Sequence, residues 1–231
     1  MANRPVFISR PEFGSLVETV SVEFEWAKGM ALSQKIRSMK SLHDTALRIG
    51  VAENILEIST ASETAFGKRL SAFNLTWPKM LGSSRPSLEA VFQSSKIFEG
   101  GGPFRDLLNV SPRDAKRDER LTTSGNLVAF DFDGERWELE PKTAFYDWIY
   151  INSIKDDHDT LEGLRAFDGF TDIMFNPQKS INCQARSAAL CRSLYINGLL
   201  EEAMETRKNF LKFVASAAKE ITPLSAQLSL F

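Results

Sequence analysis

Three side chains suited to acid–base or binding chemistry stand at helical spacing in one segment. This segment, SLEAVFQSSKIFEGGGPF, spans residues 87–104 and places Glu89, Gln93 and Lys96 at positions i, i+4 and i+7. At this spacing the three side chains share one edge of a helix, beside an apolar stripe that contains Phe92. Such an arrangement is typical of a solvated helix face or of a pocket wall. The periodicity alone favours the solvated face.

Glu89 is the first candidate catalytic residue. It can act as a general acid or base if it is buried against Phe92 and neighbouring aromatic side chains. The alternative is an exposed glutamate paired with Gln93 or Lys96, and the segment by itself favours that alternative.

Two further candidates are basic. Arg113, Lys116, Arg117 and Arg120 could clamp a pyrophosphate, but acidic residues are interleaved with them, so a self-neutralising surface helix is the better default. Lys142 is predicted in the first turn of a helix, where the backbone dipole disfavours a cation by roughly 0.3–1 kcal/mol. This position suits an amine that must act in its neutral, nucleophilic form, although a solvated lysine can also tolerate it.

The last two candidates lie near the predicted C-terminal helices. Asp172 stands in the apolar run FTDIMFN and is either a buried structural acceptor or a functional acid; the sequence does not decide between these. Asn182, in KSINCQAR, is a good N-cap for the helix that follows, whether or not its side chain also faces a ligand.

Composition limits the class of protein. The chain has 231 residues, 43% of them hydrophobic and 25% charged, as in a soluble globular protein with a sizeable core. A formal net charge of −2 argues against a protein that coats nucleic acid by charge alone, but not against an enzyme that acts on one modified nucleotide. No apolar run is long enough for a membrane span, and the N-terminal residues lack the apolar core of a signal peptide.

The cysteines and histidines indicate the compartment and the absence of a metal site. Cys183 and Cys191 are eight positions apart in one predicted helix, too far for a disulfide, which fits a reduced, cytoplasmic environment. His43 and His158 do not combine with them in a zinc-ligand spacing, so we expect metal-independent chemistry without a cofactor.

The elements that must position these residues form one mainly helical α+β domain. Strands are predicted at residues 17–26, 55–60 and 69–76, and a hairpin at 127–132 and 136–140 turns at Asp133-Gly134. Helices are predicted at residues 33–48, from the N-cap Ser87 to Gly100, from the N-cap Ser111, from Pro141, and at 182–196 and 199–220. The three glycines from Gly100 allow a tight reversal or the close approach of a ligand to the backbone.

In this order the motifs resemble the NADAR, or YbiA-like, N-glycosidases. The pattern E-x-x-F-Q-x-x-K over residues 89–96 is similar to the core motif of that family. Further similarities are S-x-F at 71–73, with Ala72 in place of the family's asparagine, S-P-x-x-A-x-R at 111–117, and the positions of Trp137, Lys142, Asp172 and Asn182. The family's glycine-rich loop is replaced by IMFNPQKSI.

One branch of the family is especially similar, namely the NADAR proteins encoded beside DarT-type DNA ADP-ribosyltransferase toxins. The stretches VEFEWAKGMALSQK, GGPFRDLL, EPKTAFYDWIYINSI and SINCQARS resemble that branch along nearly the whole chain. The resemblance implies one domain over residues 1–231, with a strand–helix extension (1–68), a catalytic core containing a small sheet or hairpins (69–198), and a C-terminal helix and tail (199–231).

The resemblance also implies a function: an antitoxin that hydrolyses the bond between ADP-ribose and guanine in ADP-ribosylated, single-stranded DNA, with a cognate DarT-type toxin as functional partner and ADP-ribose as product. Glu89 is then expected to handle the proton of the leaving base, and Lys142 to attack the anomeric carbon and form an iminium. Asp172 is expected to orient the lysine or the ribose hydroxyls. Two carboxylates without a covalent step would serve equally, and the sequence does not choose between the mechanisms.

Other residues are expected to bind the ADP-ribose and the base. Stacking is assigned to Phe73, Phe92 or Trp137, hydrogen bonding to Gln93 or Asn182, and pyrophosphate contacts to Arg117 and the backbone of Gly101 and Gly102. Asn74 and Lys96 complete the expected binding set. Three alternatives remain: a ribosylamino-pyrimidine of the riboflavin pathway as substrate, a non-catalytic module that binds ADP-ribose or the toxin, and a structural protein with no small-molecule site.

Overall fold

A four-stranded sheet organises the N-terminal part of the chain. The computed structural model describes residues 1–12, 14–29, 31–81 and 85–219. The sheet has the order β2 (Leu16–Phe24), β1 (Ala2–Arg10), β7 (Gly169–Thr171) and β3 (Ile55–Glu57). Strands β1 and β2 form a long antiparallel hairpin, whereas β3 and β7 run parallel, with Glu57 paired to Thr171. The carboxyl ends of β3 and β7 therefore meet at one edge of the sheet.

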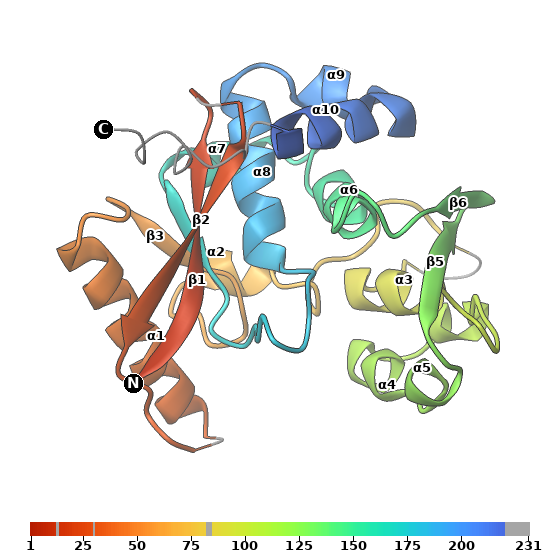
Figure 1. Cartoon of the computed structure of the whole chain (residues 1–231), viewed down its shortest axis with the longest axis horizontal. Coiled ribbons are helices and arrows are strands. Elements are labelled where there is room, and N and C mark those ends of the chain that lie inside the picture. The colour runs from red at the N-terminus through yellow and green to blue at the C-terminus, as the bar shows by residue number, and fades with distance from the viewer. Residues whose placement is uncertain (13, 30, 82–84, 220–231) are drawn as a thin grey trace, which may run out of the picture.

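Helices pack on both faces of this sheet (Figure 1). Because side chains alternate along a strand, Val6 and Ile8 of β1 pack with Met39 and Leu42 of α1 (Leu32–Arg48), whereas Phe7 joins the opposite core. That opposite face contacts α8 (Gln184–Ile196), which lies along β1, β2 and β7.

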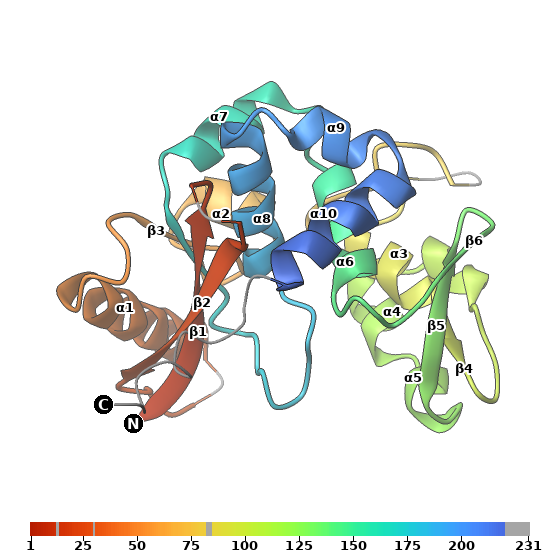
Figure 2. The same cartoon turned by 45° about the horizontal axis from the view of Figure 1, so that its top comes forward.

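A second, smaller layer holds the segment with Glu89. Its antiparallel sheet has the order β4 (Lys96–Phe98), β5 (Leu127–Phe132) and β6 (Glu135–Trp137). Phe92 of α3 (Leu88–Ser94) packs on Phe130 of β5, and α3 also contacts the 3₁₀ helix η1 (Arg105–Asn109) and α4 (Pro112–Arg117). The short helix α5 (Arg120–Thr123) follows α4. The remaining helices are α2 (Ala65–Arg69), α6 (Ala144–Asn152), α7 (His158–Arg165), α9 (Leu200–Glu205) and α10 (Arg207–Lys219). Both views place the segment that follows β7 between the two layers (Figures 1 and 2).

The predicted α+β class with an N-terminal strand and helix is confirmed, as is the hairpin turn, where Asp133 and Gly134 have φ values of 54° and 78°. The helix predicted to reach Gly100 is too long. It ends at Ser94 because the hydroxyl groups of Ser94 and Ser95 both donate to the carbonyl of Val91, and residues 96–98 pair with β5 instead.

Two other predicted elements differ. Residues 69–76 form no strand; they close α2 with turns, and only Thr76 makes an isolated bridge, to Ser87. The predicted helix 199–220 is two helices within the described residues, because Thr206 adopts an extended backbone and its side chain caps Asn209 at the start of α10. Glu220, its predicted end, lies outside the described residues.

Within the described part of the chain, no helix is both long and apolar enough to cross a membrane.

Candidate functional site

Glu89 is buried in the first turn of an embedded helix. Ser87 caps α3 by accepting a hydrogen bond from the backbone N–H of Ala90, as predicted. The whole of α3 is buried, and Glu89 itself is only 5% exposed. The predicted solvated face is therefore wrong, and the condition for Glu89 as an acid or base, burial beside aromatic side chains, is met. The ring of Tyr146 in α6 packs edge-on against Phe92, with 5.0 Å between the ring centres. The pKa of Tyr146 is raised mainly by burial and then by the charge of Glu89, which therefore lies nearby.

Two side chains contact the Glu89 carboxylate. Its Oε1 accepts a hydrogen bond of 2.8 Å from Nε2 of Gln93, one turn along α3. Lys116 of α4 places its Nζ 3.5 Å from the same oxygen. The predicted pairing with interleaved acidic residues therefore does not describe Lys116, which pairs with Glu89 of another helix. It does describe Arg120, which pairs with Asp106 and Asp118.

Lys96 follows α3 at the start of β4, within electrostatic range of Glu89. Its Nζ lies 4.8 Å from the centre of the Phe92 ring. Burial lowers the pKa of Lys96 to about 8, with the charge of Glu89 opposing this shift and that of Lys116 adding to it. An amine with this pKa is partly neutral near neutral pH.

Asp172 directly follows β7, at the carboxyl edge of the parallel strands. Its Oδ1 accepts from the backbone N–H of Met174 at 2.9 Å, and its Oδ2 accepts from Nε2 of Gln184 at 2.9 Å. Burial raises the pKa of Asp172 to about 6, whereas these hydrogen bonds and the charge of Lys116 lower it. The charge of Lys116 is therefore within electrostatic range of both candidate carboxylates, Glu89 and Asp172.

Gln184 connects the two layers around this site. Besides Asp172, its Nε2 donates to the carbonyl of Ile58 at 2.6 Å, and its Oε1 accepts from the N–H of Ala72 at 2.8 Å. The carbonyl of Ala72 in turn accepts from the N–H of Glu89 at 3.1 Å. One amide side chain thus fixes Asp172 relative to the turn that supports Glu89.

The three aromatic candidates differ in what they offer a base. Trp137 is 2% exposed, packed against Phe145 and close to the guanidinium of Arg207, so its ring offers little free surface for the predicted stacking. Phe92 is 8% exposed, with rings and Lys96 around it, and belongs to the core. Phe73 is half-buried and has the Nζ of Lys116 5.2 Å from its ring centre, which makes it the aromatic side chain best placed for stacking.

Gln93 carries an unused acceptor. Its side chain is 5% exposed, and its Oε1 has no hydrogen-bond partner among the described residues. A buried acceptor without a donor costs about 1–3 kcal/mol, so this oxygen favours a ligand that supplies an N–H or O–H group.

Lys142 lies outside the cluster formed by Glu89, Gln93, Lys96 and Lys116. The helix it was predicted to open begins two residues later, at Ala144, after Thr143 in a left-handed conformation. Lys142 is exposed, and no contact of its side chain joins it to Glu89 or Asp172 within the described residues. Its neighbour Thr143 is anchored, because its hydroxyl group donates to Asp147 and accepts from Arg186.

The remaining predicted residues have local roles or stand apart. Asn74 is exposed and donates its amide to the carbonyl of Lys68. Gly101 and Gly102 form the tight reversal, where a Cβ on Gly102 would meet the carbonyl oxygen of Lys96 at 2.4 Å. Arg117 is exposed at the end of α4. Asn182 is half-buried, but Cys183, not Asn182, is the N-cap of α8.

Lys116, Gln184 and Tyr146 were missed as site residues. Lys116 was present in the basic cluster, and its position one residue before Arg117 in the S-P-x-x-A-x-R motif was the available signal. Nothing in the sequence pattern separates Gln184 from an ordinary first-turn glutamine, because its partners come from three segments that meet only in the fold.

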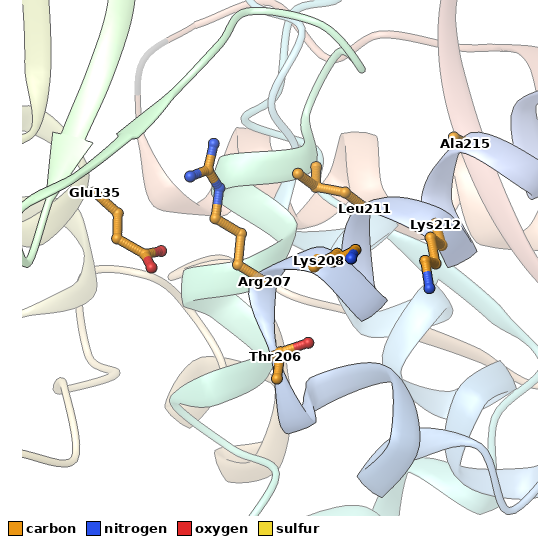
Figure 3. A pocket seen from close by; sticks show the side chains of 7 residues that line it. All are labelled: Glu135, Thr206, Arg207, Lys208, Leu211, Lys212 and Ala215. Atoms are coloured by element: carbon orange, nitrogen blue, oxygen red, sulfur yellow. The ribbon is translucent and has the colours of Figure 1, made fainter.

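Two surface cavities lie away from the candidate site. A groove of about 670 Å³ runs between α10 and β6, where Figure 3 shows Arg207, Lys208 and Lys212 of α10 with Glu135 of β6. A smaller cavity, of about 370 Å³, is lined by Leu81, by Arg105 and Leu108 of η1, and by Phe132 of β5. Neither is lined by Glu89, Lys96 or Asp172. In the part of the chain that the structure describes, no group of three or more His, Cys, Asp or Glu side chains could hold a metal ion.

The chain matches a known protein family. A family model described as DarT1-associated NADAR antitoxin matches residues 2–222, which is nearly the whole chain. A search of curated proteins finds no match.

Proposed function

The chain belongs to the DarT1-associated NADAR antitoxins, and from this premise we propose that it hydrolyses the N-glycosidic bond between ADP-ribose and a guanine base in DNA. The observation that carries the proposal is the buried Glu89 carboxylate, which contacts Gln93 and Lys116 and lies beside the amine of Lys96. In this proposal the protein acts as an antitoxin by restoring guanine after a DarT1-type toxin has modified it.

Cleavage of an N-glycoside requires a proton for the leaving base and stabilisation of positive charge at the anomeric carbon. Glu89, as the acid, gives its proton to the guanine nitrogen while the bond to the anomeric carbon breaks. Asp172 faces the same site and stabilises the developing positive charge or holds the ribose hydroxyls. Lys116 lies near both groups, and its charge stabilises the Glu89 carboxylate that forms as the proton leaves and the carboxylate of Asp172.

Two lysines are candidates for a covalent step. The neutral amine attacks the anomeric carbon as the bond to the protonated guanine breaks. One amine proton then passes to the ring oxygen as the bond between this oxygen and the anomeric carbon breaks, which leaves an iminium. Water adds to the iminium carbon and releases ADP-ribose and the free lysine. Lys142 was the lysine expected from the sequence. Lys96 fits the geometry better, because it lies beside Glu89 and has a pKa of about 8, whereas Lys142 is exposed on a turn. With neither lysine as nucleophile, Glu89 and Asp172 would activate water directly.

Substrate binding uses the groups that the fold leaves available. Phe73 stacks on the base or on the adenine of ADP-ribose, and Oε1 of Gln93 accepts a hydrogen bond from guanine or ribose. Arg117 and Asn182, exposed and half-buried near the same layers, contact the diphosphate and the ribose in this proposal.

The deciding experiment follows ADP-ribose release from a single-stranded oligonucleotide that carries ADP-ribose on one guanine. The wild type is compared with Glu89→Gln, Lys96→Arg, Lys142→Ala and Asp172→Asn, and Lys208→Ala on α10 serves as the control. Cyanoborohydride is added during turnover, because it reduces an iminium to a stable adduct that mass spectrometry assigns to one lysine.

Release by the wild type and the control, with loss in Glu89→Gln, supports the proposed hydrolase. A trapped adduct on residue 96 selects Lys96, and one on residue 142 selects Lys142. If the wild type leaves the adduct intact at high enzyme concentration, the proposal is wrong. Binding of ADP-ribose without release would then indicate a non-catalytic module, and release from a ribosylamino-pyrimidine would indicate the other substrate class.

A further inference from the structure

A carboxyl group that the proposed reaction does not use lies directly behind Asp172. Glu57 is the last residue of β3, and its side chain is 3% exposed. Because β3 and β7 are parallel and Glu57 is paired with Thr171, the Glu57 side chain reaches the backbone that leaves β7. Asp172 is the first residue of that segment.

Glu57 holds this segment on both sides of Asp172. Its Oε1 accepts from the N–H of Ile173 at 2.9 Å, and its Oε2 accepts from the hydroxyl group of Thr171 at 2.7 Å. The hydroxyl group of Ser59 completes the set at 2.6 Å from Oε1. Of these three hydrogen bonds to one buried side chain, two fix the residues before and after Asp172.

We call the hydrogen bonds of Glu57 to Thr171, Ile173 and Ser59 the clamp. A neutral histidine of α1 contacts it. Nε2 of His43 lies 2.7 Å from the hydroxyl oxygen of Thr171 and 4.0 Å from Oε2 of Glu57. Burial lowers the pKa of His43 to about 4, so the histidine is neutral and gives Glu57 no cation to pair with. Burial, and then the charge of Asp172, raises the pKa of Glu57.

A buried carboxyl group without a cation is costly, and an apolar residue would pack at the end of β3 at a lower cost. We propose that Glu57 is a positioning residue, whose hydrogen bonds to Thr171 and Ile173 hold the Asp172 carboxylate in place against Gln184 for the reaction. This inference rests on the proposed function, because it gives Asp172 a role in the reaction, but the clamp itself can be measured without activity.

Two substitutions separate positioning from packing. Glu57→Gln keeps an oxygen that accepts from Ile173 and an amide that can donate to the Thr171 hydroxyl oxygen. Glu57→Leu fills a similar volume and removes every hydrogen bond. The matched control is Ser193→Ala on α8, which removes a buried hydroxyl group that bonds Ser9 and the carbonyl of Leu16, away from Asp172.

The first readout is hydrogen exchange of the amides of residues 173–175, measured by mass spectrometry. The second is the rate of ADP-ribose release at saturating oligonucleotide, together with the Kd for the oligonucleotide. For Glu57→Leu we expect exchange at least tenfold faster and release at least tenfold slower, with Kd changed less than threefold. Glu57→Gln and Ser193→Ala should stay within threefold of wild type in all three quantities.

Several results would overturn the inference. One is hydrogen exchange at residues 173–175 that is unchanged in Glu57→Leu. Another is faster exchange in Glu57→Leu with an unchanged rate of ADP-ribose release. A third is a loss of this rate in Ser193→Ala as large as that in Glu57→Leu. If Glu57→Leu does not fold, Thr171→Val replaces it, because it removes one of the clamp's hydrogen bonds while Glu57 stays, and it must show the same changes to a smaller degree. If the wild type releases no ADP-ribose, the proposed function fails, and exchange alone then decides whether the clamp exists.

Discussion

The Nζ atom of Lys116 lies 3.5 Å from Oε1 of Glu89, so a cation on an exposed helix reaches a carboxylate that is otherwise enclosed by α3 and α6. Half of the lysine side chain remains in solvent, at 56% exposure, whereas the Glu89 side chain is 6% exposed. The aliphatic stem of Lys116 spans this boundary, and its charged end also lies over Phe73. Lys116 therefore links the carboxylate to the aromatic side chain that is available for stacking.

Removal of this cation should impair the reaction more than binding. In Lys116→Ala, Glu89 loses its charged partner and Asp172 loses a favourable charge, so we expect kcat for ADP-ribose release to fall by roughly tenfold, about 1.4 kcal/mol, with a smaller change in KM. Steady-state kinetics on the modified oligonucleotide measures this effect. Arg113→Ala, one turn earlier on the exposed face of α4, should change kcat/KM by less than twofold, and equal losses in both variants would contradict the specific role of Lys116.

The pH dependence of the covalent step follows from the lowered pKa of Lys96. A nucleophilic amine must be neutral, and below a pKa of about 8 the amine carries a proton. The single-turnover rate should therefore rise about tenfold per pH unit below pH 8 and level off above it. Glu57 titrates in the same range, so the profile is repeated in Glu57→Gln. A rate that is flat from pH 6 to 9 in both proteins would exclude Lys96 as the nucleophile.

Local patterns predicted the elements whose signals are contained within a few residues. Ser87 and Ser111 cap helices as expected, Asp133-Gly134 turns the hairpin, and α1 lies within a residue or so of its predicted bounds. Each of these features depends on neighbours in sequence, so the sequence pattern is sufficient to predict it.

Tertiary contacts decided the rest. Lys96 is seven residues after Glu89, a helical spacing, but its backbone pairs with β5 and it is therefore a strand residue. Its amine nevertheless lies over the ring of Phe92. Glu57, Gln184 and Asp172 meet because two short parallel strands end together, a pairing across more than a hundred residues that no local pattern encodes. The candidate carboxylates and Gln93, the helical neighbour of Glu89, could thus be named from the sequence, whereas Gln184 and Glu57, which hold the segment around Asp172, could not.

The buried Glu57 should make stability depend on pH. Burial, and then the charge of Asp172, raises its pKa in the folded protein from 4.5 to about 8. Between these values the folded state holds a proton that the unfolded state has lost, so the free energy of unfolding should fall as pH rises, by at most about 1.4 kcal/mol per pH unit. Urea denaturation at pH 5, 6.5 and 8 measures this slope. Glu57→Gln should flatten it, and an unchanged slope in that variant would assign the effect to other groups.

Phe73 should contribute to substrate affinity through stacking. Its replacement in Phe73→Ala should weaken binding of the modified oligonucleotide by about 1–3 kcal/mol, as for other base–aromatic contacts. Fluorescence anisotropy with a labelled oligonucleotide measures the Kd. Phe66→Ala is the matched control, because Phe66 is also half-buried beneath a cation, with Arg69 5.5 Å from its ring centre, but it packs against Phe167 instead of lining the site. A similar loss in both variants would point to general destabilisation.

Asp147 should stabilise the packing of α6 against α8. It is 1% exposed and accepts hydrogen bonds from Thr143 at 2.7 Å and Ser187 at 2.6 Å, and it also pairs with Arg186. Asp147→Ala leaves a largely buried guanidinium without its partner, so we expect the free energy of unfolding in urea to fall by about 3–5 kcal/mol. Lys40→Ala breaks an ion pair with Glu63 in which both side chains are about half exposed, and it should cost less than about 1 kcal/mol. Equal losses in the two variants would mean that the Asp147 network contributes no more than a surface pair.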